Sequence, residues 1–115
     1  MIFIIEDDEM MSECIADACD VSDVKTFSNI YDAISTIDES FPDLIFLDIL
    51  LSGADGFTLL NELASYSDTS KIPVVIVSSL DFSGKDLSIY GVVGTINKDT
   101  MTREEIRSYA KRYTH

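Results

Sequence analysis

Short apolar runs alternate with segments of helical periodicity along this chain, and that alternation most constrains its fold. The run Val74–Ser78 is rich in β-branched residues, which favour strands. In another segment Ile30, Ala33 and Ile37 recur at the spacing of one helical face. Five strand and helix pairs can be assigned in this way. The expected strands are Met1–Ile5, Val21–Phe27, Asp43–Asp48, Val74–Ser78 and Val92–Asn97.

The first, third and fourth runs are apolar between their polar ends, which is typical of strands buried on both faces. Such strands form parallel sheets that helices cover on both sides. We therefore predict one α/β domain over residues 1–115, a doubly wound parallel sheet of five βα repeats. The helix after the fourth strand is expected to be short, near Phe82–Tyr90, and the last helix is expected to begin at Thr102.

Charge and hydropathy exclude several classes of partner. The 115 residues include 21 acidic and 8 basic ones, so the net charge is −13. A field of that sign repels phosphate backbones, so we expect no direct nucleic-acid binding. No apolar run approaches the roughly 20 residues that span a bilayer. The start of the chain lacks the basic region of a signal peptide, and we expect a cytoplasmic protein without membrane contact.

Polar residues stand where four of the expected strands end. They are Glu6-Asp7-Asp8, Asp48, Ser78-Ser79 and Asn97-Lys98. Each has a plain structural explanation by itself, as a helix cap, a first-turn helix residue, a loop cap, a turn residue or a solvated charge. However, the carboxyl ends of parallel strands meet at one edge, where ligands bind in open α/β sheets. Their joint placement therefore predicts a site that contains carboxylates, a hydroxyl and an ammonium group.

Such a set of groups suits phosphoryl transfer. Carboxylates brought close together repel each other, and without a cation the pKa of one of them rises. Mg²⁺ relieves this repulsion, because it takes oxygen ligands and is commonly held by one or two carboxylates together with a phosphate. A lysine and the metal would neutralise the phosphoryl oxygens while a carboxylate acts as nucleophile and forms an aspartyl phosphate.

These residues resemble the receiver domain of two-component response regulators. Asp48 ends an apolar strand and is followed by Asp55-Gly56, as the acceptor aspartate is in that family. Ile4–Asp8 is similar to the family's acidic cluster, Val75–Ser79 to its hydroxyl segment and Gly94–Lys98 to its lysine segment. The four motifs have the family's order and spacing and cover the whole chain. The resemblance implies the flavodoxin-like receiver topology, with strand order 2-1-3-4-5.

The resemblance also implies a metal site for Mg²⁺, or for Mn²⁺. Asp7 would be a direct ligand together with Asp48, and Glu6 would act mainly through a metal-bound water. The backbone carbonyl of Leu50 would be a further ligand. Asp8 falls one position past the acidic pair, and we expect it in the first turn of a helix.

For the chemistry, the resemblance implies that Asp48 accepts a phosphoryl group from a phosphohistidine. The donor would be a sensor histidine kinase or a histidine phosphotransfer protein. Ser78 would donate a hydrogen bond to one phosphoryl oxygen, and Lys98 would pair with another. The protein would be a switch that catalyses only its own phosphorylation and dephosphorylation and controls an output partner or domain.

Three positions depart from the family pattern, and two other functions stay open. Asp99 follows Lys98 where a proline is common. Ser52 replaces a common proline, and Thr95 replaces a common aromatic switch residue, which leaves the route to the output undecided. One alternative is a degenerate receiver that binds proteins independently of phosphorylation, although the set of site residues is intact. The other is a flavodoxin-like nucleotide binder. The four acids after the first strand argue against it, because they would repel a phosphate.

Overall fold

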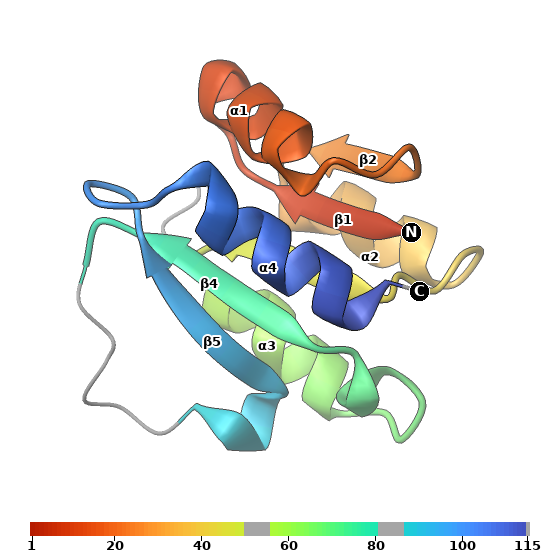
Figure 1. Cartoon of the computed structure of the whole chain (residues 1–115). Helices are drawn as coiled ribbons and strands as arrows, with labels where there is room; N and C mark the ends of the chain where they lie inside the picture. Colours follow the sequence, from red (N-terminus) through yellow and green to blue (C-terminus); the bar gives the residue numbers. More distant parts are fainter. Residues whose placement is uncertain (50–55, 81–86, 115) are drawn as a thin grey trace.

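One sheet of five parallel strands forms the centre of the molecule, in the order β2-β1-β3-β4-β5 (Figure 1). The computed structural model describes residues 1–49, 56–80 and 87–114. The strands are β1 (Ile2–Ile5), β2 (Val24–Phe27), β3 (Leu44–Asp48), β4 (Val74–Ser78) and β5 (Val92–Asn97). Both the parallel direction and the order agree with the predicted topology.

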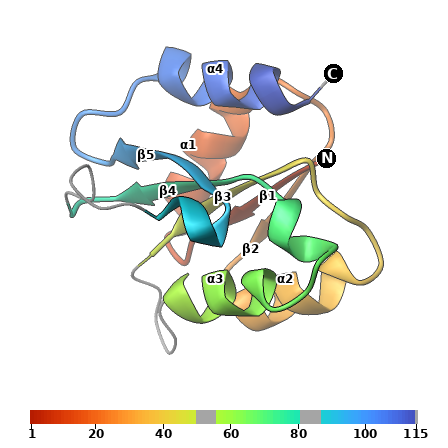
Figure 2. The same cartoon turned by 90° about the horizontal axis from the view of Figure 1, so that it is seen from below.

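Helices cover both faces of the sheet. They are α1 (Glu9–Cys19), α2 (Ile30–Ile37), α3 (Gly56–Ala64) and α4 (Arg103–Tyr113), with short 3₁₀ helices η1 (Thr69–Lys71) and η2 (Ser88–Tyr90). Figure 2 shows α1 and α4 on one face and α2 and α3 on the other. In the described part of the chain, no helix combines the length and the apolar character needed to cross a bilayer.

The apolar side chains form two cores, one on each side of the sheet. Every residue of β1, β3 and β4 is buried, which explains why these three runs lack polar residues except where β3 and β4 end. Alternate side chains point to opposite faces, so Phe3 packs towards α2 and α3 while Phe46 packs towards α1 and α4. The doubly wound arrangement therefore follows from strands that must bury both faces.

Two polar side chains begin the helices that flank the sheet on one side. Asp8 is the N-cap of α1, where its Oδ1 accepts hydrogen bonds from the amides of Met10 (3.0 Å) and Met11 (3.2 Å). It therefore lies one step before the first turn in which we expected it. Thr102 caps α4 as predicted, because its Oγ1 accepts from the amide of Glu105 at 3.1 Å.

Two of the predicted elements differ from the structure. The second strand begins at Val24 rather than Val21, because the chain first turns through Asp20, which has a φ of 56°. Four α-helices are present in the described segments instead of five. The helix expected near Phe82–Tyr90 falls partly outside them, and its described end is the 3₁₀ helix η2, which Gly91 ends with a φ of 80°.

A tyrosine from α4 fills the space above a glycine of β5. A Cβ atom added to Gly94 would lie 2.6 Å from Cζ of the Tyr109 ring, well inside normal contact. Glycine at this position therefore lets the ring lie directly on the strand backbone. The contact therefore joins the last helix directly to the backbone of β5.

Candidate functional site

Polar side chains from four strands meet at the carboxyl edge of the sheet. Glu6 directly follows β1, Asp48 ends β3, Ser78 ends β4, and Lys98 directly follows β5. Their positions follow from the parallel direction of the strands, because all strands then end at the same edge. The predicted convergence of these residues is therefore seen in the structure.

Three carboxylates form the acidic part of this site. Glu6, Asp7 and Asp48 each offer a carboxylate oxygen, and these oxygens lie within 4.8 Å of one another. Asp7 is exposed, whereas Glu6 and Asp48 are only 3% and 6% exposed. A hollow of about 310 Å³ between α1 and the end of β2 is lined by Glu6 and Asp7 among others. The carboxylates thus combine burial on one side with an approach on the other.

Lys98 places its ammonium group between two of these carboxylates. Its Nζ donates to Glu6 Oε1 at 2.8 Å and to Asp48 Oδ2 at 3.1 Å. The backbone amide of Lys98 donates to the carbonyl oxygen of Ser78 at 3.0 Å, which attaches the lysine segment to the end of β4. Burial lowers the pKa of Lys98, but the hydrogen bonds to Glu6 and Asp48 outweigh that effect and the pKa is raised. The ammonium therefore stays charged.

Glu6 is the carboxylate of the site whose charged form is least favourable. Burial and the neighbouring Asp48 carboxylate raise the pKa of Glu6 from 4.5 to about 7, although Lys98 acts in the opposite direction. Its Oε2 atom is buried and has no hydrogen-bond partner within the described residues. Three carboxylates and one ammonium leave two negative charges when all are ionised. The charge balance and the unsatisfied oxygen therefore fit a hard divalent cation with oxygen ligands.

Ser78 completes the set from the neighbouring strand. It is 2% exposed, and its Oγ accepts a hydrogen bond from the amide of Leu80 at 3.1 Å. This bond holds the hydroxyl at the end of β4, beside the segment that carries Lys98. The arrangement thus brings a hydroxyl and an ammonium group to the same edge as the carboxylates.

Comparison with known proteins decides the family. The family model described as the response regulator receiver domain matches residues 2–111, nearly the whole chain. The chain belongs to the response regulator receiver family. Receiver domains are signalling modules of two-component systems, which agrees with the predicted class of protein.

Individual relatives resemble this receiver domain over different lengths. Response regulator PleD from Caulobacter vibrioides is 38% identical over 52 residues, which is 45% of this chain and 12% of PleD. The receiver domain of NtrX from Brucella abortus has a TM-score of 0.83 at 24% identity and covers 98% of this chain and 97% of its own. The Mn²⁺-bound form of response regulator Rcp1 has a TM-score of 0.73 at 19% identity, over 96% of this chain and 88% of its own. The NtrX and Rcp1 structures therefore support the fold, and the receiver spans a small part of PleD.

One predicted site residue of this receiver domain, and one position that departs from the family pattern, have no described structure. Leu50, the expected backbone ligand, and Ser52 lie outside the described residues. Conversely, no local pattern indicated that one lysine bonds both Glu6 and Asp48. The contact of Tyr109 with Gly94 was also missed, although a glycine inside a strand is a signal of close approach by another group.

Proposed function

We propose that this receiver domain accepts a phosphoryl group onto Asp48 from a phosphohistidine, in a reaction that depends on Mg²⁺. The observation that supports this most strongly is the cluster of Glu6, Asp7 and Asp48 with Lys98 bound between two of them. A purely structural cluster would not require a buried glutamate with an unsatisfied oxygen. Such strain is typical of sites that bind a further group.

The cation would be held by the carboxylates of Asp7 and Asp48 and by the backbone carbonyl of Leu50, while Glu6 would act mainly through a metal-bound water. When bound, it would supply positive charge that offsets the charge of the transferring phosphoryl group. Mn²⁺ could replace Mg²⁺, as the Mn²⁺-bound form of Rcp1 suggests for a protein of this fold. We propose metal binding as a property of the whole cluster rather than of one residue.

The protein's own groups would position the reaction. Lys98 holds Oδ2 of Asp48 at 3.1 Å, which orients the carboxylate. An oxygen of Asp48 forms a bond to phosphorus as the bond from phosphorus to the donor's histidine nitrogen breaks. The bonding electrons leave with the imidazole. The ammonium of Lys98 and the hydroxyl of Ser78 would then bind phosphoryl oxygens, which stabilises the aspartyl phosphate.

The donor class would be a sensor histidine kinase or a histidine phosphotransfer protein, and the domain would act in the cytoplasm. We propose that residues 1–115 form the receiver unit and that phosphorylation controls an output partner or domain. The added charge, about −1.5 to −2, would bias the packing of the segments that carry Ser78 and Lys98. The protein's only catalysis would concern its own phosphorylation state.

Acetyl phosphate, a small phosphodonor, tests this proposal. With Mg²⁺ present we expect one acid-stable, base-labile modification of the chain, detected by intact mass. Asp48→Asn should abolish it and EDTA should suppress it. The control Asp99→Asn makes the same chemical change at an exposed residue next to Lys98 and should leave labelling intact. No labelling at any Mg²⁺ concentration would instead support the alternative, a degenerate receiver that works as a binding module.

A further inference from the structure

A second cavity lies between α2, α3 and the turn that leads to β4, at the opposite edge of the sheet from Asp48. Its volume is about 170 Å³, and none of its lining residues belongs to the carboxylate cluster. Each helix runs antiparallel to the strand before it, so the last turns of α2 and α3 lie towards the edge where the strands begin. We call this cavity the α2–α3 pocket. It is lined by Ile34, Ile37, Asp38, Glu62, Leu63, Tyr66, Asp68 and Thr69.

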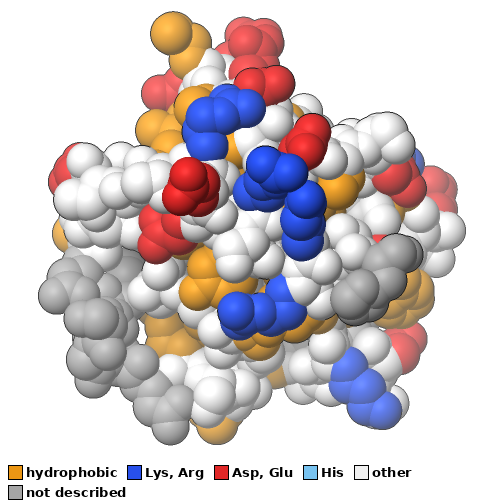
Figure 3. Space-filling model, in the orientation of Figure 1, with side chains coloured by type: hydrophobic (Ala, Val, Ile, Leu, Met, Phe, Trp, Pro, Cys, Tyr) orange, Lys and Arg blue, Asp and Glu red, His pale blue; other side chains and the backbone are white. Residues whose placement is uncertain are grey.

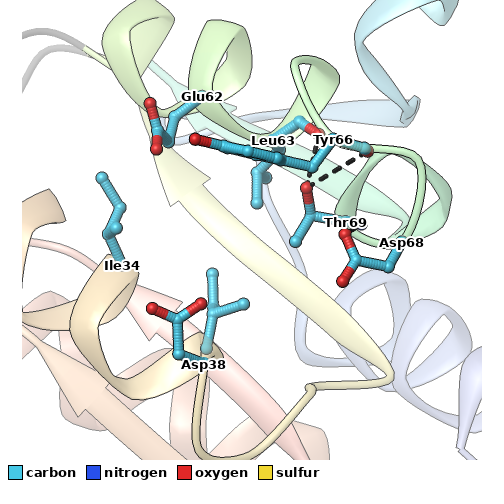
Figure 4. Close-up of a pocket in the computed structure, with 8 residues that line it drawn as sticks. Ile34, Asp38, Glu62, Leu63, Tyr66, Asp68 and Thr69 are labelled. Carbon is cyan, nitrogen blue, oxygen red and sulfur yellow. Dashed lines mark hydrogen bonds between the residues drawn. The ribbon is translucent and has the colours of Figure 1, made fainter.

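The α2–α3 pocket combines an apolar floor with an acidic rim. Ile37 and Leu63 belong to the buried core, while Asp38 and Glu62 are exposed at the rim. Figure 4 shows the Tyr66 ring across the gap from Asp38, with Glu62 near the hydroxyl end of the ring. No lysine or arginine lines the pocket. The pocket thus presents carboxylates and an aromatic ring around an apolar base.

Two of the three carboxylates are available to a ligand. Asp68 already accepts a hydrogen bond from the amide of Thr69 at 2.9 Å. Asp38 and Glu62 have no side-chain hydrogen bond or ion pair within the described residues. The turn that carries the ring is held in place, because Thr69 Oγ1 donates to the carbonyl of Leu63 at 2.6 Å. The wall of the pocket is therefore formed before a ligand arrives.

The charges and dimensions exclude several occupants. Anions would be repelled by the rim. A shared metal ion is disfavoured, because within the described residues the carboxylates close enough to hold one ion are Glu6, Asp7 and Asp48. A volume of about 170 Å³ is below the roughly 300–1,000 Å³ typical of drug-sized ligands, so a nucleotide would not fit. A second copy carries a net charge of −13 as well and would be repelled.

We propose that the α2–α3 pocket binds an arginine side chain of a basic partner protein. The aliphatic stem would lie on Ile37 and Leu63, as long charged side chains cover apolar surface with their methylene groups. The guanidinium presents five N–H donors in a plane, so it can bond Asp38 and Glu62 together while it stacks on the exposed Tyr66 ring. Lysine offers a point charge and no plane to stack. This inference does not rest on phosphorylation of Asp48.

Titration of the ¹⁵N-labelled full chain with N-acetyl-arginine-methylamide tests the proposal. The capped citrulline compound is the matched ligand control, because it has nearly the same shape and no charge. We expect amide shifts that centre on α2, α3 and the following turn with the arginine compound and none with citrulline. Free arginine should bind more weakly, since its carboxylate meets the acidic rim. This comparison separates a protein-borne arginine from the free amino acid.

Variants locate the binding to the pocket. The double change Asp38→Asn and Glu62→Gln should weaken binding about ten-fold, since each ion pair at an exposed rim contributes a small part. Tyr66→Leu should weaken it about two- to five-fold, the size of an exposed cation–π contact. Glu39→Gln, an exposed acid beside Asp38 that does not line the pocket, should leave the affinity unchanged. Equal loss from Glu39→Gln, equal binding of citrulline, or shifts centred on Asp48 would each overturn the proposal.

Discussion

Replacing Glu6 with glutamine should change how the stability of the metal-free domain depends on pH. The pKa of Glu6 is about 7 in the folded protein and 4.5 as its ordinary value, because burial and Asp48 disfavour the charged form. The folded state therefore holds a proton that the unfolded state has already lost between these pH values. The stabilisation from this protonated form is fully present below pH 4.5 and is lost as the pH rises through 7.

The size of the effect follows from the same two values. Between pH 5 and 8 the linkage amounts to at most about 2.5 kcal/mol of unfolding free energy, since one pKa unit corresponds to about 1.4 kcal/mol. That is a large part of the roughly 5–15 kcal/mol by which domains are stable. The side chain is almost fully buried, so solvent screens this contribution little. Glu6→Gln cannot lose a proton and should remove this contribution.

Urea unfolding in EDTA at several pH values, followed by circular dichroism, measures the effect. The difference in unfolding free energy between the parent and Glu6→Gln should change by about 2 kcal/mol from pH 5 to 8. Glu13→Gln, an exposed acidic residue on α1, controls for the general repulsion of a chain with net charge −13. Saturating Mg²⁺ should flatten the parent's profile, because the cation favours the ionised form. A parent and a Glu6→Gln variant with parallel pH profiles in EDTA would refute the reasoning.

Two further predictions concern the packing of α4 and the lifetime of the phosphorylated state. Gly94→Ala should destabilise the domain by about 1–3 kcal/mol, because the new Cβ overlaps the Tyr109 ring. Urea unfolding measures this change in stability. Adding Tyr109→Leu to the Gly94→Ala chain should recover part of the lost stability. The phosphorylated domain should lose its phosphoryl group slowly, because Leu80, which is 52% exposed beside Ser78, offers no polar group to orient an attacking water. Leu80→Glu should shorten the half-life of the phosphorylated domain several-fold, and intact mass measures that half-life. Loss from the unmodified domain within seconds would contradict this second prediction.

The central strands could be predicted because burial on both faces leaves a strong mark on the sequence. Three of the five predicted strands are apolar apart from their ends. They correspond closely to β1, β3 and β4, the strands that are buried at every residue. The edge strand β2 is half-exposed and contains Lys25 and Thr26, so its start could not be placed by composition. The site could be foreseen for the same geometric reason, since parallel strands end at one edge.

Contacts between side chains of distant elements could not be predicted. The position of the Lys98 ammonium depends on the twist of β5 relative to β1 and β3, which no local pattern encodes. The ring of Tyr109 reaches Gly94 across the gap between a helix and a strand, and the helical pattern shows only that Tyr109 faces inwards. The sequence pattern predicts Asp8 in the first turn of α1, one residue away from its actual position as the N-cap, because only the backbone angles distinguish the two positions.

The strand order has a consequence for how the site assembles as the chain is made. After β2, each new strand joins the same growing edge of the sheet, in the order in which it is synthesised. Glu6, Asp7 and Asp48 are thus all present once β3 exists, whereas Lys98 arrives only after β5. A nascent chain that stops short of residue 98 brings the three carboxylates together without the Lys98 ammonium. We expect the last step of folding to be the one that places the Lys98 ammonium between Glu6 and Asp48 and so reduces the negative charge of the site.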